Sequence, residues 1–199
     1  MNRLVESLMP HLLLAPILLP MLTGGLMLLL REEKRQTKVL INIGSTALGL
    51  VIAIGLLMWV KAQAGNDSGT ATIGVYLPGN WAAPFGIVLA LDRLSAMMLV
   101  LTSLTGLASV LFASARWHRA GVHYHPLFQF QLMGLCGAFL TADLFNLFVF
   151  FEIMLSASYG LMLHGSGRTR VQAGLHYIAI NLAASSLFLI GVSMLYGIT

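Results

Sequence analysis

The composition of this 199-residue chain is that of a membrane protein. Hydrophobic residues make up 58% of the chain and charged residues only 9%, whereas soluble domains carry about 25% charged residues. A soluble domain of this size cannot hide so much apolar surface, because a small fold leaves much of its area exposed. The single cysteine excludes an intrachain disulfide and a thiolate metal cage. The net charge of +4 lies in clusters between apolar runs, which indicates membrane topology and argues against nucleic-acid binding.

Six apolar runs follow one another along the chain, and a helix needs about 20 such residues to cross the bilayer. They lie at 8–30, 39–60, 88–113, 126–142, 145–164 and 172–197. The first run contains three prolines, which membrane helices tolerate when they pack against neighbours. A charged segment follows that run instead of a small-residue cleavage site, so it is not a signal peptide. The sequence predicts an all-α polytopic membrane protein with about six transmembrane helices in a single unit.

The connectors between these runs predict the orientation of the chain. Those at 31–38, 114–125 and 165–171 hold eight Lys and Arg residues, whereas the opposite side of the membrane has only Arg3 and Lys61. Because cytoplasmic loops carry an excess of Lys and Arg, we expect the three connectors in the cytoplasm and both ends of the chain outside.

The longest connector, 61–86, is expected outside the membrane. Within it Ile73, Val75 and Leu77 alternate before a turn at 78–80, a pattern typical of a short hairpin. We interpret this segment as a structured external loop without chemistry of its own.

Glu152 is an ionisable residue deep in the fifth run. A charged side chain at mid-bilayer costs at least about 2.5–3.5 kcal/mol, so it is expected to face the bundle interior and mark an ion or proton path. Ser156 and Tyr159 share its helical face. A carboxylate held between desolvation and a nearby cation can take up and release a proton near neutral pH. We therefore predict a proton relay; the alternative is a protonated Glu that only hydrogen-bonds neighbouring helices.

A cationic partner for Glu152 is missing from the middle of every run. The candidates within the chain are His176 and, less plausibly, Arg93 near the outer surface. The chain also ends at Thr199, directly after a hydrophobic run. Together these features predict that the partner lies beyond residue 199 or in another subunit, and that the chain is a fragment.

The sixth run carries a polar stripe. Tyr177, Asn181 and Ser185 recur at four-residue steps beside His176. Such groups commonly only hydrogen-bond neighbouring helices, but a share in a hydrated pathway with Ser156 and Tyr159 stays open.

Three further residues are expected to have structural or interface roles. Asp143 lies at the tight turn between the fourth and fifth runs, where a helix N-cap is the simplest explanation. Asp92 and Arg93 begin the third run at the outer interface, where they can pair with one another or with adjacent helices.

The histidines predict neither a metal site nor a cofactor. His118, His123 and His125 cluster on the cytoplasmic side without an accompanying carboxylate or cysteine, so a solvated loop is favoured over metal binding. His11 and His176 could in principle ligate haem, but nothing positions them opposite each other.

Several segments resemble a known membrane family. Residues 79–87 and 91–95 resemble the start of the third helix of antiporter-like membrane subunits. Residues 140–154, LTADLFNLFVFFEIM, are similar to the fourth-to-fifth helix region of the D-type subunit of the multisubunit Mrp-type (Pha, Mnh) monovalent cation/proton antiporters. That family is similar to the proton-pumping membrane subunits of respiratory complex I. Residues 170–181 continue the likeness, which covers nearly the whole chain and is firmest over 74–199.

The resemblance implies a function and an incomplete site. In the family a glutamate of the fifth helix pairs with a lysine of a broken seventh helix, and Glu152 occupies the position of that glutamate. The lysine has no counterpart here, because a full subunit has about fourteen helices and this chain resembles its N-terminal part. The implied function is Na⁺ or K⁺ exchange for protons in a bacterial inner membrane, with the N-terminus periplasmic. Other subunits of a hetero-oligomeric complex are the implied partners.

Two other functions stay open at this point. The first is a proton-pumping membrane subunit of complex I or a related hydrogenase, which would co-purify with iron–sulfur and flavin subunits. The second, from a different class, is an assembly subunit that transports nothing and only scaffolds a complex.

Overall fold

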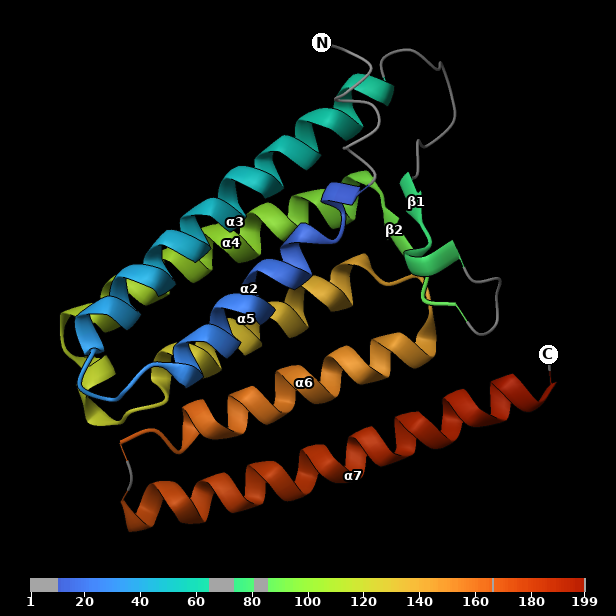
Figure 1. The fold of residues 1–199 in the computed structure, drawn as a ribbon. Helices are drawn as coiled ribbons and strands as arrows, with labels where there is room; N and C mark the ends of the chain where they lie inside the picture. Colours follow the sequence, from blue (N-terminus) through green and yellow to red (C-terminus); the bar gives the residue numbers. More distant parts are fainter. Residues whose placement is uncertain (1–10, 65–73, 81–85, 166, 199) are drawn as a thin grey trace.

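A computed structural model describes residues 11–64, 74–80, 86–165 and 167–198 as a bundle of antiparallel helices with a small sheet at one end (Figure 1). The helices and strands follow in the order α2 (Ala15–Leu29), α3 (Arg35–Ala64), β1 (Gly74–Tyr76), β2 (Leu89–Leu91), α4 (Arg93–Ala115), α5 (Tyr124–Leu140), α6 (Leu144–Met162) and α7 (Arg168–Ile198). Two short 3-10 helices, η1 (Pro78–Asn80) and η2 (Trp117–Ala120), lie in the connectors.

In the part of the chain that the structure describes, each of the six predicted runs overlaps one of the helices α2 to α7, and the helical membrane fold is confirmed. Among the described residues, α3, α4, α6 and α7 are long and apolar enough to span a bilayer, and α2 is a shorter apolar helix. The helix of the fourth predicted run, α5, has 17 residues. The helices are joined at alternating ends, so helices that follow one another in sequence run antiparallel (Figure 1).

The third helix begins five residues later than the run 88–113 predicts. Leu89–Leu91 form β2, which pairs antiparallel with β1 so that Val75 faces Ala90. The strand interpretation of 73–77 therefore holds for Gly74–Tyr76, but its partner lies beyond residue 86 and not directly after the turn at 78–80. Residues 81–85 and Ile73 lie outside the described residues. Leu89 also bridges to Thr141, which ties the small sheet to the turn between α5 and α6.

The bundle has a central helix and an outlying one. α5 packs against α2, α3, α4 and α6, whereas the main contact of α7 is with α6 alone. The main hydrophobic core lies between α2, α3, α4, α5 and β2, and includes Leu13, Leu56, Leu91, Leu99 and Leu140. α6 and α7 therefore form a pair on one flank of the bundle (Figure 1), and most of their apolar side chains are at least partly exposed.

Candidate intramembrane carboxylate site

Glu152 lies near the middle of α6, and its position along the bundle is set by the capped start of that helix. Asp143 is the N-cap residue: one carboxylate oxygen accepts from the backbone N–H of Phe145 at 3.0 Å, and the other accepts from the Asn146 side chain at 2.9 Å. This arrangement satisfies one of the free N–H groups at the helix start. Glu152 follows about 12 Å along the helix axis from Leu144, the first residue of α6.

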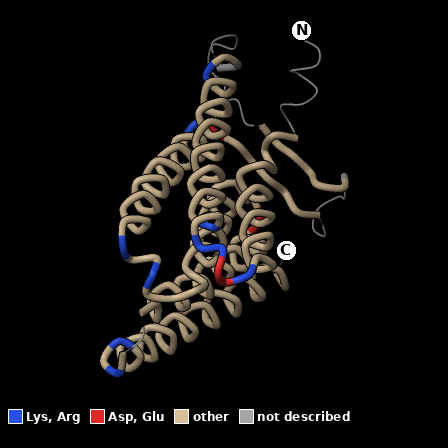
Figure 2. Tube along the Cα trace, turned by 60° about the vertical axis from the view of Figure 1, so that its left-hand side comes forward, with Lys and Arg blue, Asp and Glu red and all other residues tan. Residues whose placement is uncertain are grey.

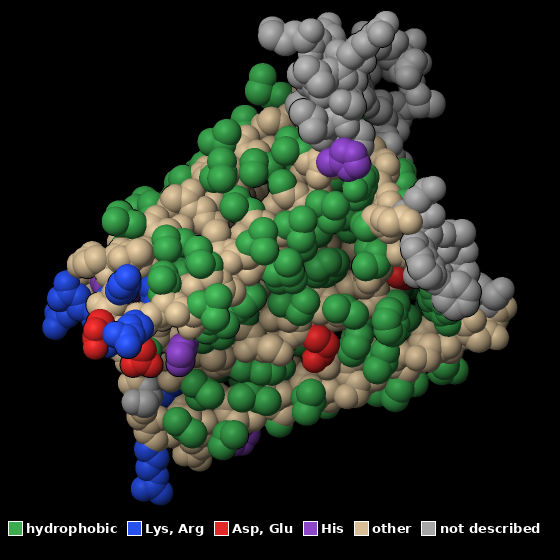
Figure 3. All heavy atoms as spheres, viewed as in Figure 1, with side chains coloured by type: hydrophobic (Ala, Val, Ile, Leu, Met, Phe, Trp, Pro, Cys, Tyr) green, Lys and Arg blue, Asp and Glu red, His purple; other side chains and the backbone are tan. Residues whose placement is uncertain are grey.

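The Glu152 side chain is half-buried, and its Oε1 atom is buried without a hydrogen-bond partner among the described residues. A buried polar atom without a partner costs about 1–3 kcal/mol, and more when it is charged. On the face drawn in Figure 3, hydrophobic side chains cover much of the surface, and the Lys and Arg side chains gather at one end. The site therefore calls for a donor or cation in addition to the described residues.

The residues predicted on the Glu152 face are only partly brought together. Tyr159 is half-buried and interacts electrostatically with Glu152. The Tyr159 ring meets the Tyr177 ring edge-on at 5.8 Å, and the Tyr177 hydroxyl lies 3.5 Å from Ser158 Oγ. Ser156 is exposed. A tyrosine pair thus joins α6 to α7 at the level of residue 159, two helical turns from Glu152.

Two residues of the polar stripe of α7 line a groove between α6 and α7, and Glu152 is not among the residues that line it. Asn181 and Ser185 contribute to an open cavity of about 300 Å³ between α6 and α7, whose wall also includes Phe148, Phe151 and Phe188. Asn181 donates to the Tyr177 carbonyl and Ser185 to the Leu182 carbonyl, so both amide and hydroxyl are engaged within their own helix.

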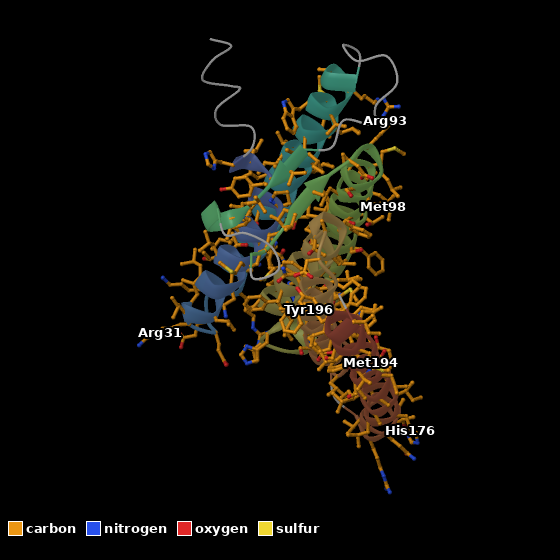
Figure 4. All side chains as sticks on the ribbon, turned by 90° about the vertical axis from the view of Figure 1, so that its right-hand side faces the viewer. Arg31, Arg93, Met98, His176, Met194 and Tyr196 are labelled. Carbon is orange, nitrogen blue, oxygen red and sulfur yellow. The ribbon has the colours of Figure 1, made fainter. Side chains whose placement is uncertain are left out.

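Neither candidate partner from the sequence lies against Glu152. His176 is exposed on α7, where its Nδ1 lies 3.0 Å from the Gln172 carbonyl. Arg93 is exposed at the first position of α4. Figure 4 shows these two residues at opposite ends of the molecule. The cation that would balance Glu152 is therefore supplied by neither of them in this structure.

Asp92 has a structural role at the start of α4. Its carboxylate accepts the backbone N–H of Ser95 at 2.6 Å. This hydrogen bond to the charged form holds the pKa of Asp92 below its ordinary value of 3.8.

The sequence did not reveal a buried network of polar side chains between α5 and the helices α2 and α3. Gln129, 1% exposed, donates to the Asn42 Oδ1 atom at 2.7 Å and to Thr46 Oγ1 at 3.1 Å, and its own oxygen accepts from Thr23 and Ser45. The signal in the sequence was the spacing of Asn42, Ser45 and Thr46, which places three polar residues on one face of α3.

The expectation of a solvated histidine loop is wrong for two of its three members. His118 and His125 are buried, at 6% and 4% exposure, and only His123 is exposed. His118 lies in η2, which folds back onto the bundle so that its ring meets the His125 ring at 5.4 Å. Within the described residues no group of three or more His, Cys, Asp or Glu could hold a metal ion.

Known proteins similar to this chain agree on one family. Residues 141–199 match the family described as "NADH:quinone oxidoreductase/Mrp antiporter, TM". The D-type subunit of a probable K⁺/H⁺ antiporter from Rhizobium meliloti is 57% identical over 94% of this chain and 34% of its own length. The D-type subunit of a Na⁺/H⁺ antiporter from Alkalihalophilus pseudofirmus is 38% identical over 96% of this chain and 37% of its own length.

Solved structures give the same result for the fold. A chain of the Mrp complex from Dietzia sp. DQ12-45-1b superposes with a TM-score of 0.86 at 35% identity, covering 97% of this chain and 35% of that one. A chain of an archaeal membrane-bound sulfane sulfur reductase gives 0.83 at 26% identity, covering 94% and 37%. This chain therefore spans about a third of the length of the relatives it matches. Over that third it is similar to the D-type subunits of K⁺/H⁺ and Na⁺/H⁺ antiporters and to a chain of an Mrp complex, which is the resemblance that the motifs of its sequence indicated.

Proposed function

We propose that this chain is part of a membrane subunit of a multisubunit antiporter that exchanges Na⁺ or K⁺ for protons, and that Glu152 relays the proton. The observation that carries the proposal is the buried Glu152 Oε1 atom without a hydrogen-bond partner among the described residues. A carboxyl group in that setting is satisfied by binding a proton or by meeting a cation, and alternation between the two is what a relay requires.

The names of the relatives support the choice of ions. The two antiporter relatives are named as K⁺/H⁺ and Na⁺/H⁺ antiporter subunits, and the one with 57% identity is the K⁺/H⁺ subunit. Exchange driven by a proton gradient needs a group that responds to the membrane potential. Moving one elementary charge across a potential of 100 mV changes the free energy by about 2.3 kcal/mol. Protonation of Glu152 inside the bilayer would couple to that field.

The proposed setting is a bacterial cytoplasmic membrane and a complex with other subunits. The Lys and Arg residues lie mainly in or beside the connectors 30–34, 116–123 and 163–167 (Figure 2), and we place the end of the bundle that these connectors form in the cytoplasm. Partner helices are expected beside α6, because Glu152 needs a donor or cation there and α7 covers only one side of it.

The test is Glu152→Gln in the full-length subunit assembled in its complex. Glutamine keeps the shape and hydrogen-bonding ability of the side chain but cannot bind and release a proton. We expect loss of K⁺- or Na⁺-dependent proton flux in inverted membrane vesicles, with unchanged assembly. Glu33→Gln, which neutralises an exposed carboxylate in a connector, is the matched control and should retain full flux. Normal flux in Glu152→Gln would refute the relay.

The same variant separates the transport proposal from a scaffold role. If the subunit only holds a complex together, Glu152→Gln would lower the amount of assembled complex while the flux per complex stays unchanged.

A proton-pumping subunit of a respiratory complex is the second candidate, supported by the likeness to the sulfane sulfur reductase chain. Co-purification with flavin and iron–sulfur subunits would favour that candidate over an antiporter.

A further inference from the structure

Two buried histidines and a buried lysine lie together at the positively charged end of the bundle. Lys38 of α3 is 3% exposed, His118 of η2 is 6% exposed and His125 of α5 is 4% exposed. We call these three residues the buried histidine site. Burial of a lysine is unusual, because lysine side chains are mostly exposed unless they are paired.

The hydrogen bonds of the site assign the protons of both imidazole rings. His118 Nδ1 lies 3.1 Å from the Ala113 carbonyl, which can only accept, so this nitrogen carries the proton. His125 Nδ1 lies 2.8 Å from Asn42 Nδ2, which can only donate. The orientation of Asn42 follows from its other contact, since its Oδ1 accepts from Gln129. A neutral His125 therefore holds its proton on Nε2, which is buried without a hydrogen-bond partner among the described residues.

A chain of directional hydrogen bonds connects His125 to three helices. Asn42 donates to His125, Gln129 donates to Asn42, and the Gln129 oxygen accepts from Thr23 Oγ1 of α2 at 3.3 Å and Ser45 Oγ of α3 at 3.4 Å. Both members between His125 and the hydroxyls are amides, which present a donor at one end and an acceptor at the other. The direction of the chain therefore matches the unprotonated Nδ1 of His125, and the same direction is held by a bond from Gln129 Nε2 to the Asn42 backbone carbonyl at 3.3 Å.

A second proton on His125 would reverse this chain. Both ring nitrogens then donate, so Asn42 has to turn its oxygen toward the ring and Gln129 has to turn its oxygen toward Asn42. The hydroxyls of Thr23 and Ser45 can accept as well as donate, so the chain can end there in either direction. Two buried amides would have to rotate together within the contact between α3 and α5.

Positively charged groups around His125 repel a second proton on its ring, so protonation would destabilise the packing around it. The groups whose charges act on it are His118 from η2, Lys38 from α3 and His164 from the connector after α6. Its neighbour Tyr124 packs on both His125 and His164, and α2 contributes the uncharged Thr23. No carboxylate is among the described groups that act on His125. An added positive charge on His125 is repelled by Lys38, His118 and His164. This repulsion favours separation of the segments that carry these residues from α5.

We propose that His125 is a proton-sensing site, whose protonation reverses the Asn42–Gln129 chain and loosens the packing of α3 against α5 at the positively charged end of the bundle. The proposal is independent of the proposed relay at Glu152, because its primary readout requires no transport. It adds a device through which pH on that side of the membrane would act on the bundle.

Cys136 is a built-in reporter for this change. It is the single cysteine of the chain and 5% exposed. Together with Gln129, Ser45 and Thr46 it lines a cavity of about 20 Å³ at the far end of the hydrogen-bond chain, room for about one water molecule. Loosening of α3 from α5 would open this cavity to a small reagent.

The experiment measures the labelling rate of Cys136 by a membrane-permeant maleimide in the assembled complex between pH 8 and pH 3.5, read by peptide mass spectrometry. The range extends into acid because burial and the neighbouring positive groups oppose protonation of His125. The rate of the wild type is divided by that of His125→Gln at each pH, which cancels the titration of the thiol itself. We expect a ratio near one at pH 8 that rises severalfold on acidification. A ratio that stays flat over this range would overturn the proposal. His123→Gln, two residues away and exposed, should give the wild-type curve.

A second variant keeps the test decisive if His125→Gln fails to assemble. Lys38→Met removes one of the repelling charges, so His125 should accept its proton at higher pH. The midpoint of the labelling curve is expected to move upward by about one pH unit. A packing role for Lys38 alone would change the labelling at all pH values without moving the midpoint, and an unmoved midpoint therefore refutes the sensing role.

Discussion

At the residue scale, Asp92 shows how a single side chain fixes the start of a membrane helix. Replacing Asp92 by Ala removes the acceptor for the Ser95 N–H and is expected to cost about 0.5–2 kcal/mol of stability. Asp92→Asn keeps an acceptor and should recover most of this loss. Thermal unfolding of the complex in detergent, followed for both variants, measures the difference.

The pH dependence of that contribution follows from the lowered pKa of Asp92. Because the folded pKa lies below the ordinary 3.8, the charged form contributes stability that is fully present above about pH 5 and is lost as the pH falls through the folded pKa. The gap between wild type and Asp92→Ala should therefore be widest at neutral pH and narrow in acid. A gap that is independent of pH between 7 and 3 would contradict the charged cap.

The sequence singles out Glu152 as a candidate site residue, whereas the buried polar groups around Gln129 and His118 do not stand out in it, and the difference has a physical reason. Glu152 is conspicuous in the sequence because a charge inside an apolar run is costly wherever the helix packs. Asn42 and Gln129 carry no such signal, since uncharged amides are tolerated in many membrane helices. The burial of His118 depends on how η2 folds back onto α5, which is a tertiary contact that no local pattern encodes.

At the element scale, the contact between α5 and α6 depends on a glycine. A Cβ atom placed on Gly134 would lie 2.7 Å from the Cβ and 2.8 Å from the backbone nitrogen of Met154. The backbone cannot yield as a side-chain end can, so Gly134→Ala forces the two helices apart. We expect a loss of about 1–3 kcal/mol, measured as a lower thermal unfolding temperature.

The control for this substitution lies in α3. A Cβ on Gly55 meets nothing within 4 Å, and alanine is the better helix former by about 1 kcal/mol. Gly55→Ala should therefore leave stability unchanged or raise it. Equal effects of the two substitutions would show that Gly134 acts through helix propensity and not through close packing.

The boundaries of elements were less predictable than their existence. The run beginning at residue 88 reads as continuous with the third helix, because a short apolar stretch looks alike in a buried strand and a helix. Its strand character comes from pairing with β1 and from Thr141, both distant in sequence. Long apolar runs such as that within α3, by contrast, are decided by length and hydropathy alone.

At the scale of the whole molecule, the packing of the helices brings the Lys- and Arg-rich connectors to one end of the bundle. α3 begins, α4 ends, α5 begins and α6 ends at the Lys- and Arg-rich end, whereas the small sheet and the α5–α6 turn lie at the other (Figure 1). Glu152 lies between these ends, and the buried histidine site lies near the charged one. The proposed relay and the proposed sensor are therefore at different depths and on opposite sides of α5, which allows them to be tested separately.

The orientation can be tested with single cysteines in a Cys136→Ser background. Val75 in β1 is 59% exposed, and Glu33 and Arg168 are exposed in or beside two connectors at the opposite end. If positive charge directs the chain as expected, a membrane-impermeant maleimide added to intact cells labels Val75→Cys at once. Glu33→Cys and Arg168→Cys should react only after the membrane is permeabilised. The reverse pattern would place the buried histidine site on the external face, and the sensor would then respond to external pH while its internal chemistry stayed the same.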